Sequence, residues 1–306
     1  MWQGHAADAW RALTRDAFRR RRGGLRVLDG PGGRDAPLWP YVHVLWAAAD
    51  IHLLGEEVDM DALAALLERF ARGEAYVATP PERQRYFDDN AWLGLAALRL
   101  AEATRDAGWT DLARRLASFL ERGEHPAGGI RWREGSESRN TCSTAAAAWL
   151  LALTGGAGGI ERPARWLDWL DATLRRPDRL FADRIERDEV HQEAWTYNQG
   201  AVVAARAGIG RADDGLVDAV VTHWDADRLW REPPAFLAIA GRAFFQQPLL
   251  RERALDWLDA HLLRMVDDAR DPVSGWYMRG DLGSYNGRRT IDQAAIVQLF
   301  ALRAGV

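Results

Sequence analysis

Apolar positions recur at helical spacing along almost the whole chain. In segment 59–72, one stripe carries Leu63, Leu66, Leu67 and Phe70, and the charged residues Asp61, Glu68 and Arg69 lie elsewhere. This spacing is typical of a helix with one solvent-facing side. Runs of alternating β-branched residues, which would indicate strands, are almost absent. With Gly, Pro and Asp as punctuation, the pattern predicts twelve helices, over residues 6–22, 40–54, 59–72, 89–107, 110–122, 140–154, 163–174, 197–207, 213–223, 235–245, 249–267 and 290–304.

The predicted helices alternate between two kinds. The odd-numbered segments are amphipathic, whereas the even-numbered segments are apolar nearly all round; segment 89–107, for example, carries no charge from Ala91 to Leu98. A helix that is apolar on every side is buried on every side. Six buried helices alternating with six half-exposed ones predict an all-α (α/α)6 barrel, with residues 1–306 as a single domain. An irregular bundle or a solenoid is the alternative, and the lack of a fixed-period repeat counts against the solenoid.

Aromatic and polar residues gather just before or at the start of the even-numbered segments. In the predicted barrel the inner helices are parallel, so these positions share one end of the molecule. Aromatic rings stack on sugar rings, and amides and carboxylates pair with sugar hydroxyls. A single Asp, Asn or Thr at a helix start is explained as an N-cap, but the whole set at one end indicates a carbohydrate site. The tryptophans that are candidates for stacking on sugar are Trp39, Trp132, Trp195 and Trp276.

Two adjacent carboxylates, Asp88 and Asp89, stand at the start of an otherwise apolar segment. An N-cap explains one of them, but like charges repel when partly desolvated, and the helix dipole offsets only about 0.3–1 kcal/mol. Glycoside hydrolysis needs such a pair, one carboxylate ionised and the other holding a proton. Adjacent residues place the two carboxyls about 5–7 Å apart, which favours retention (roughly 5–5.5 Å) over inversion (roughly 6.5–9.5 Å) without assigning the roles.

Three ordered motifs then suggest a family. The segment Tyr86–Trp92, which contains both aspartates, resembles the catalytic motif of glycoside hydrolase family 76, the endo-α-1,6-mannanases. The run Gly128–Trp132 followed by Asn140 resembles that family's next motif, and Thr196–Gly200 resembles its third. Order and spacing agree, and the similarity extends over most of the chain.

The resemblance implies a retaining glycoside hydrolase that acts on α-1,6-linked mannose chains or oligosaccharides. It also implies that Asp88 is the nucleophile and Asp89 the acid/base. The residues expected to bind the substrate are Tyr86, Trp132, Asn140, Trp195, Tyr197, Asn198 and Gln199. Because the family includes cell-wall relatives that transfer glycans, transglycosylation stays open.

Composition narrows the chemistry further. All 40 basic residues are Arg, which excludes Schiff-base lysines and Walker phosphate loops. Cys142 is the only cysteine, so neither a disulfide within the chain nor a multi-thiolate metal site can form. We expect no cofactor and no metal.

A net charge of -4 gives no reason to expect nucleic acid or a membrane as partner. No export signal or membrane span is evident, so we expect a cytoplasmic monomer. The run Arg19–Arg22 is interpreted as a solvated helix end.

Two other functions fit the same barrel. A different sugar enzyme, such as an epimerase or an unsaturated-uronyl hydrolase, would use other residues; an epimerase would be expected to use histidines, for which His43 and His191 are the candidates. A non-catalytic glycan-binding protein would keep the cleft and lack turnover.

Overall fold

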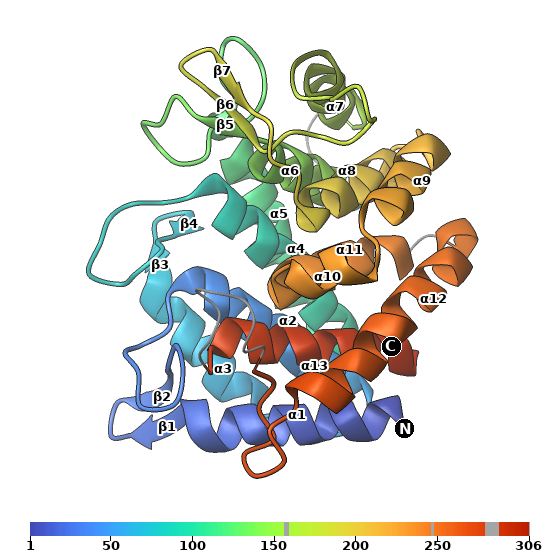
Figure 1. Ribbon diagram of the computed structural model, residues 1–306. Helices are drawn as coiled ribbons and strands as arrows, with labels where there is room; N and C mark the ends of the chain where they lie inside the picture. Colours follow the sequence, from blue (N-terminus) through green and yellow to red (C-terminus); the bar gives the residue numbers. More distant parts are fainter. Residues whose placement is uncertain (156–158, 246–247, 279–287, 306) are drawn as a thin grey trace.

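The computed structural model describes residues 1–155, 159–245, 248–278 and 288–305, and Figure 1 shows a helical molecule with a few short strands. The helices are α1 (Trp2–Ala17), α2 (Leu38–Leu53), α3 (Met60–Leu67), α4 (Phe87–Thr104), α5 (Ala107–Leu120), α6 (Thr141–Thr154), α7 (Glu161–Thr173), α8 (Thr196–Gly208), α9 (Asp214–His223), α10 (Ala226–Arg231), α11 (Pro234–Phe245), α12 (Pro248–Arg264) and α13 (Thr290–Ala304). Single turns follow three of them, η1 (Glu68–Phe70), η2 (Glu121–Gly123) and the π-helical η3 (Met265–Ala269).

Six of the helices close into an inner ring. Going round the ring, α2, α4, α6, α8, α11 and α13 each contact the next, and α13 returns to α2. Outside the ring, α1 packs on α13, α5 on α4, α7 on α6, α9 on α8 and α12 on α11. The inner helices are the even-numbered segments of the sequence pattern, so the predicted (α/α)6 barrel is confirmed. None of the described helices is both long and apolar enough to cross a membrane.

Small residues let the inner helices approach closely. A Cβ atom on Gly200 would lie 2.6 Å from the Cα of Ala240, so α8 and α11 could not pack as they do with a larger residue there. At the end of the ring where α2 finishes, the fully buried Asp50 binds two guanidinium groups, those of Arg99 from α4 and Arg242 from α11. A buried carboxylate needs charged partners, so this ion cluster joins α2, α4 and α11 at that end of the barrel.

The opposite end is held together by a repeated hydrogen bond. The fourth residue of an inner helix accepts a hydrogen bond from the backbone of the loop that leads into that helix, which fixes the loop beside the helix start. The four cases are Tyr76 N to Asn90 Oδ1 (2.8 Å), Ile130 N to Thr144 Oγ1 (2.9 Å), Phe181 N to Gln199 Oε1 (2.8 Å) and Tyr277 N to Gln293 Oε1 (3.1 Å). We call the four loop residues Tyr76, Ile130, Phe181 and Tyr277 the anchor residues.

A second repeated bond joins each unit to its neighbour. The residue two positions after each of the first three anchor residues accepts a hydrogen bond through its backbone carbonyl. The donor is the N–H of the first residue of the preceding inner helix. The bonds are Leu38 N to Ala78 O (2.8 Å), Phe87 N to Trp132 O (2.9 Å) and Thr141 N to Asp183 O (2.9 Å). The helix N-termini, whose first N–H groups lack partners within the helix, are thereby satisfied by the adjacent loop.

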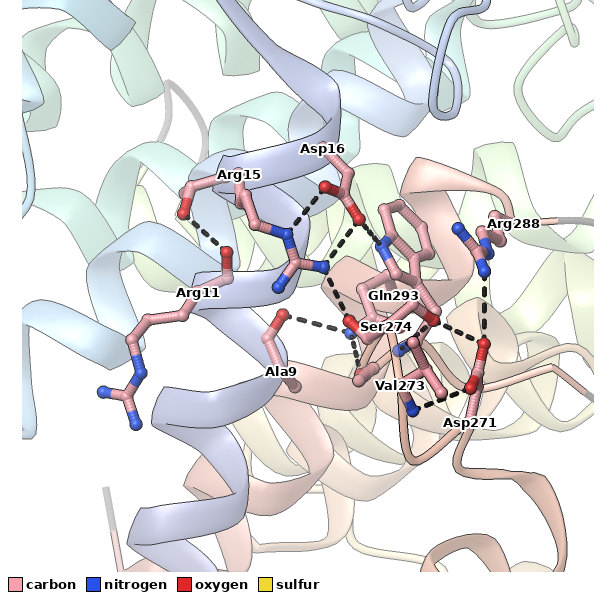
Figure 2. A network of polar contacts seen from close by, with 12 residues as sticks. Ala9, Arg11, Arg15, Asp16, Asp271, Val273, Ser274, Arg288 and Gln293 are labelled. Atoms are coloured by element: carbon pink, nitrogen blue, oxygen red, sulfur yellow. Dashed lines mark hydrogen bonds and ion pairs between the residues drawn. The ribbon is translucent and has the colours of Figure 1, made fainter.

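The seam between the two ends of the chain is polar, and Figure 2 shows it. The Gln293 side chain donates to the carbonyl of Ala9 (3.0 Å), which ties α13 to α1. The indole of Trp276 donates to Asp16 (2.8 Å), and its ring is fully buried. Trp276 therefore cannot stack on a sugar, and the interpretation of this residue as a candidate platform was wrong.

Short hairpins replace parts of the predicted helices and loops. Strands β1 (Phe18–Arg21) and β2 (Gly24–Val27) pair antiparallel, so the arginine run lies mainly in a hairpin and the predicted helix ends five residues early. Gly24, at φ +102°, permits the tight turn. The other strands are β3 (Ala71–Arg72), β4 (Ala75–Tyr76), β5 (Arg139–Asn140), β6 (Arg184–Glu186) and β7 (Glu189–His191). The short helix α10 was not predicted either.

Candidate active site

A cavity of about 680 Å³ opens where the inner helices begin. Its inner wall is aromatic: Tyr197 stacks on Phe236 with ring centroids 4.0 Å apart, and Trp92 lies between Trp39 and Tyr197 at 6.0 and 6.3 Å. Loops from the surrounding hairpins supply polar groups, among them Asp183. An aromatic wall with convergent polar groups is the usual composition of a small-molecule site.

The second residue of four inner helices reaches this cavity. Trp39 of α2, Asp88 of α4, Cys142 of α6 and Tyr197 of α8 all line it. Because the inner helices are parallel and joined at their starts, equivalent positions converge on the ring axis. The sequence expectation that the unusual residues share one end of the barrel agrees with this arrangement.

The Asp88 carboxylate is surrounded by donors. Its Oδ1 accepts from the backbone N–H of Asp89 (3.0 Å), and its Oδ2 accepts from the indole of Trp132 (3.1 Å) and from the thiol of Cys142 (3.6 Å). In the described part of the chain, no donor reaches the Asp89 carboxyl. The two neighbouring carboxyls therefore have different surroundings.

These surroundings act on the two pKa values. Burial raises the pKa of Asp88 to about 6, and the hydrogen bonds from Asp89 N–H, Trp132 and Cys142 oppose that rise. Burial raises the pKa of Asp89 well above its ordinary value, and the charge of Asp88 raises it further. Because the donors lie at Asp88, they favour the ionised form at Asp88 and the protonated form at Asp89.

A match to a known family decides the identity. The sequence model of glycosyl hydrolase family 76 matches residues 29–213. The chain belongs to glycosyl hydrolase family 76. It is therefore a glycoside hydrolase, and its sequence matches no curated protein.

Solved structures share the barrel of this family 76 hydrolase. The α-1,6-mannanase of Salegentibacter sp. HEL1_6 is 20% identical, with a TM-score of 0.78 over 99% of each chain. An α-mannanase of the same family from Bacteroides thetaiotaomicron is 14% identical, with a TM-score of 0.81 over 99% of this chain and 95% of that one. An inactive variant of the Salegentibacter enzyme, with two consecutive aspartates changed to asparagine, is in complex with α-1,6-mannotriose.

Several predicted site residues of the family 76 hydrolase do line the cavity. Asp88, Asp89, Tyr86, Trp132, Asn140 and Tyr197 all contribute to its wall. Tyr86 and Trp132 meet edge to face with centroids 5.0 Å apart, and 38% of the Trp132 surface is exposed. Trp132, expected as a sugar platform, also donates to Asp88 through its indole nitrogen.

Two other predicted residues lie behind the wall instead. Gln199 is fully buried, and its amide bonds both backbone groups of the anchor residue Phe181. Asn198 is also fully buried and donates to Asp183 (3.2 Å). These two residues position the site from outside the cavity, so their prediction as cleft-lining groups was wrong. Trp195 is half-buried and packs edge to face on the cavity-lining Phe236, and its role in sugar binding stays a prediction.

Sequence reasoning missed Asp183, a third carboxylate in the cavity. It is 8% exposed and is held by Asn198 and by Arg184 (2.8 Å). Asp183 follows its anchor residue Phe181 by two positions, as Trp132 follows Ile130. That common spacing was the available signal, but it becomes visible only once the anchors are known.

The histidines proposed for an epimerase do not reach the cavity. His43 is fully buried against the ring of Trp39, with centroids 4.4 Å apart. Burial and the nearby Arg242 lower the pKa of His43 to about 3, so this side chain stays neutral. His191 lies on β7, where it pairs with the cavity-lining Arg184 but does not itself line the cavity. Neither histidine therefore forms part of the cavity wall.

Proposed function

We propose that this hydrolase cleaves α-1,6-linked mannose chains with retention of configuration, with Asp88 as the nucleophile and Asp89 as the acid/base. The observation that carries the proposal is the unequal hydrogen bonding of the pair. Three donors converge on the Asp88 carboxylate, and none in the described chain reaches Asp89. An ionised nucleophile beside a protonated acid is the arrangement that double displacement requires.

In the first step, an oxygen of Asp88 attacks the anomeric carbon, and the glycosidic oxygen leaves with the proton of Asp89. In the second step, Asp89 takes a proton from a water molecule, which attacks the same carbon and releases Asp88. Each step inverts the anomeric centre, so the product has the configuration of the substrate.

The linkage is supported by the relatives. The Salegentibacter protein is an α-1,6-mannanase, and its variant lacking two consecutive aspartates is inactive and holds α-1,6-mannotriose. In this chain Asp88 and Asp89 are the consecutive aspartates of the cavity. For sugar binding we propose the exposed ring of Trp132 as a stacking surface, and Asp183 as an acceptor for sugar hydroxyls.

Proton NMR during digestion of α-1,6-mannotetraose tests the proposal. We expect newly formed reducing ends to be α-anomers at first and to mutarotate later, and α-1,2-linked mannotriose to remain intact. Asp88→Asn and Asp89→Asn should each lose activity while their circular dichroism spectra stay unchanged. Initial β-anomers, or full activity in either variant, would contradict the proposed mechanism. Products longer than the substrate would indicate transfer in place of hydrolysis.

A further inference from the structure

The side chain of Cys142 lies against the proposed nucleophile. Cys142 is the second residue of α6, is 2% exposed and borders the cavity. Its sulfur is 3.6 Å from Asp88 Oδ2, a hydrogen-bonding distance for sulfur. The double displacement described above assigns no task to this thiol.

The direction of this hydrogen bond follows from charge. An ionised carboxylate can only accept, so the thiol must donate to Asp88. Burial, together with the charges of Asp88 and Asp183, raises the pKa of Cys142 well above its ordinary value, so the thiol keeps the proton that it donates.

We infer that Cys142 is a positioning residue whose thiol donates a hydrogen bond to the Oδ2 atom of Asp88. Trp132 donates to the same oxygen (3.1 Å), so two side-chain donors from different loops and helices hold one end of the carboxylate. Such charge-assisted bonds favour the ionised form. The inference rests on the proposed role of Asp88 as the nucleophile.

The alternative is that the thiol only fills space, as buried cysteines often do. Two substitutions separate these roles. Cys142→Ser keeps a donor at the same position, whereas Cys142→Ala removes the donor together with the sulfur atom. If space filling were the whole role, the two variants could differ in stability, but neither would move the pH at which activity falls.

The test is the pH dependence of kcat/KM on α-1,6-mannotetraose. In Cys142→Ala we expect the acidic limb to move up by about half a pH unit, because a lost weak donor makes Asp88 easier to protonate. That displacement is about a three-fold loss of kcat/KM on the acid side, with little change at the plateau. Cys142→Ser should keep the wild-type limb.

An acidic limb that is the same in Cys142→Ala and wild type would overturn the inference. So would equal displacement in the Ala and Ser variants. These outcomes are distinct from failure of the proposed function, which would show as activity in Asp88→Asn. If Asp88→Asn is inactive and the limb does not move in Cys142→Ala, only the role of the thiol is refuted.

Discussion

Replacing Asp88 by Asn should stabilise the protein at neutral pH while removing its activity. A carboxyl whose pKa is higher in the folded chain than in the unfolded chain binds its proton more tightly when folded. Below the pKa that it has in the unfolded chain, such a group costs the folded state no free energy. The cost grows as the pH rises toward the pKa that the group has in the folded chain. For Asp88 this window runs from 3.8 to about 6. Above it, the folded protein carries the full cost of the charge.

The magnitude follows from that shift. A rise from 3.8 to about 6 corresponds to about 3 kcal/mol, at roughly 1.4 kcal/mol per unit. Solvent in the open cavity screens part of this cost. An Asn side chain cannot accept from all three donors, so about 1 kcal/mol of hydrogen bonding is lost. We expect a net gain of about 1–2 kcal/mol at pH 7.5, or about 2–6 °C in Tm for a chain of this size.

The assay is differential scanning calorimetry of wild type and Asp88→Asn at pH 4 and pH 7.5. The gain should be present at pH 7.5 and absent or reversed at pH 4, where wild-type Asp88 is protonated. Asp111→Asn is the control, because its carboxylate is exposed and pairs with the exposed Arg114. A loss of Tm that is equal at both pH values would refute the reasoning, since the cost of the Asp88 charge would then be absent.

Three further expectations concern pH and packing. The value of kcat/KM should fall below about pH 6, where Asp88 takes up a proton, and should fall again at alkaline pH, where Asp89 loses its proton. A profile that is flat across pH 6 would contradict the role of Asp88 as the nucleophile. Gly129→Ala should lower Tm more than Gly135→Ala. Both glycines have φ near +70°, so the backbone strain is the same, but a Cβ added at Gly129 would lie 2.5 Å from the ring of Trp169 and one added at Gly135 would meet nothing within 4 Å. In urea unfolding, Asp50→Ala should cost about 3–5 kcal/mol, because the buried Arg242 loses its carboxylate and Arg99 is left with Glu102. A cost below about 1 kcal/mol would mean that the cluster is not structural.

The barrel could be predicted because burial is encoded in composition. The run Ala145–Leu153 carries no polar group that needs water, so it could only be an inner helix, and it forms most of α6. The hairpins escaped prediction because their strands are two to four residues long, too short for a period of two to be recognised. The β1–β2 hairpin also follows directly on a helix of the same polar composition.

The candidate site was predictable to the extent that its residues come in consecutive pairs and motifs. Asp88 and Asp89 drew attention because two adjacent carboxylates at a helix start demand an explanation. Gln199 was misplaced because an amide in a sugar-binding motif looks the same whether it contacts a sugar or a backbone. Asp183 was missed because its position depends on a hydrogen bond from the Phe181 N–H to the Gln199 side chain, which links residues 18 apart and leaves no local pattern.

The anchors also define which parts of the rim can change. Between the carbonyl of Trp132 and the start of α6, and between Asp183 and the start of α8, the chain forms hairpins whose tips contain Gly135 and the pair Arg187–Asp188, all with positive φ. Both ends of each hairpin are tied to the helix starts. Lengthening a tip would therefore extend the cleft wall without moving the dyad, so reach along a glycan can be redesigned independently of bond cleavage.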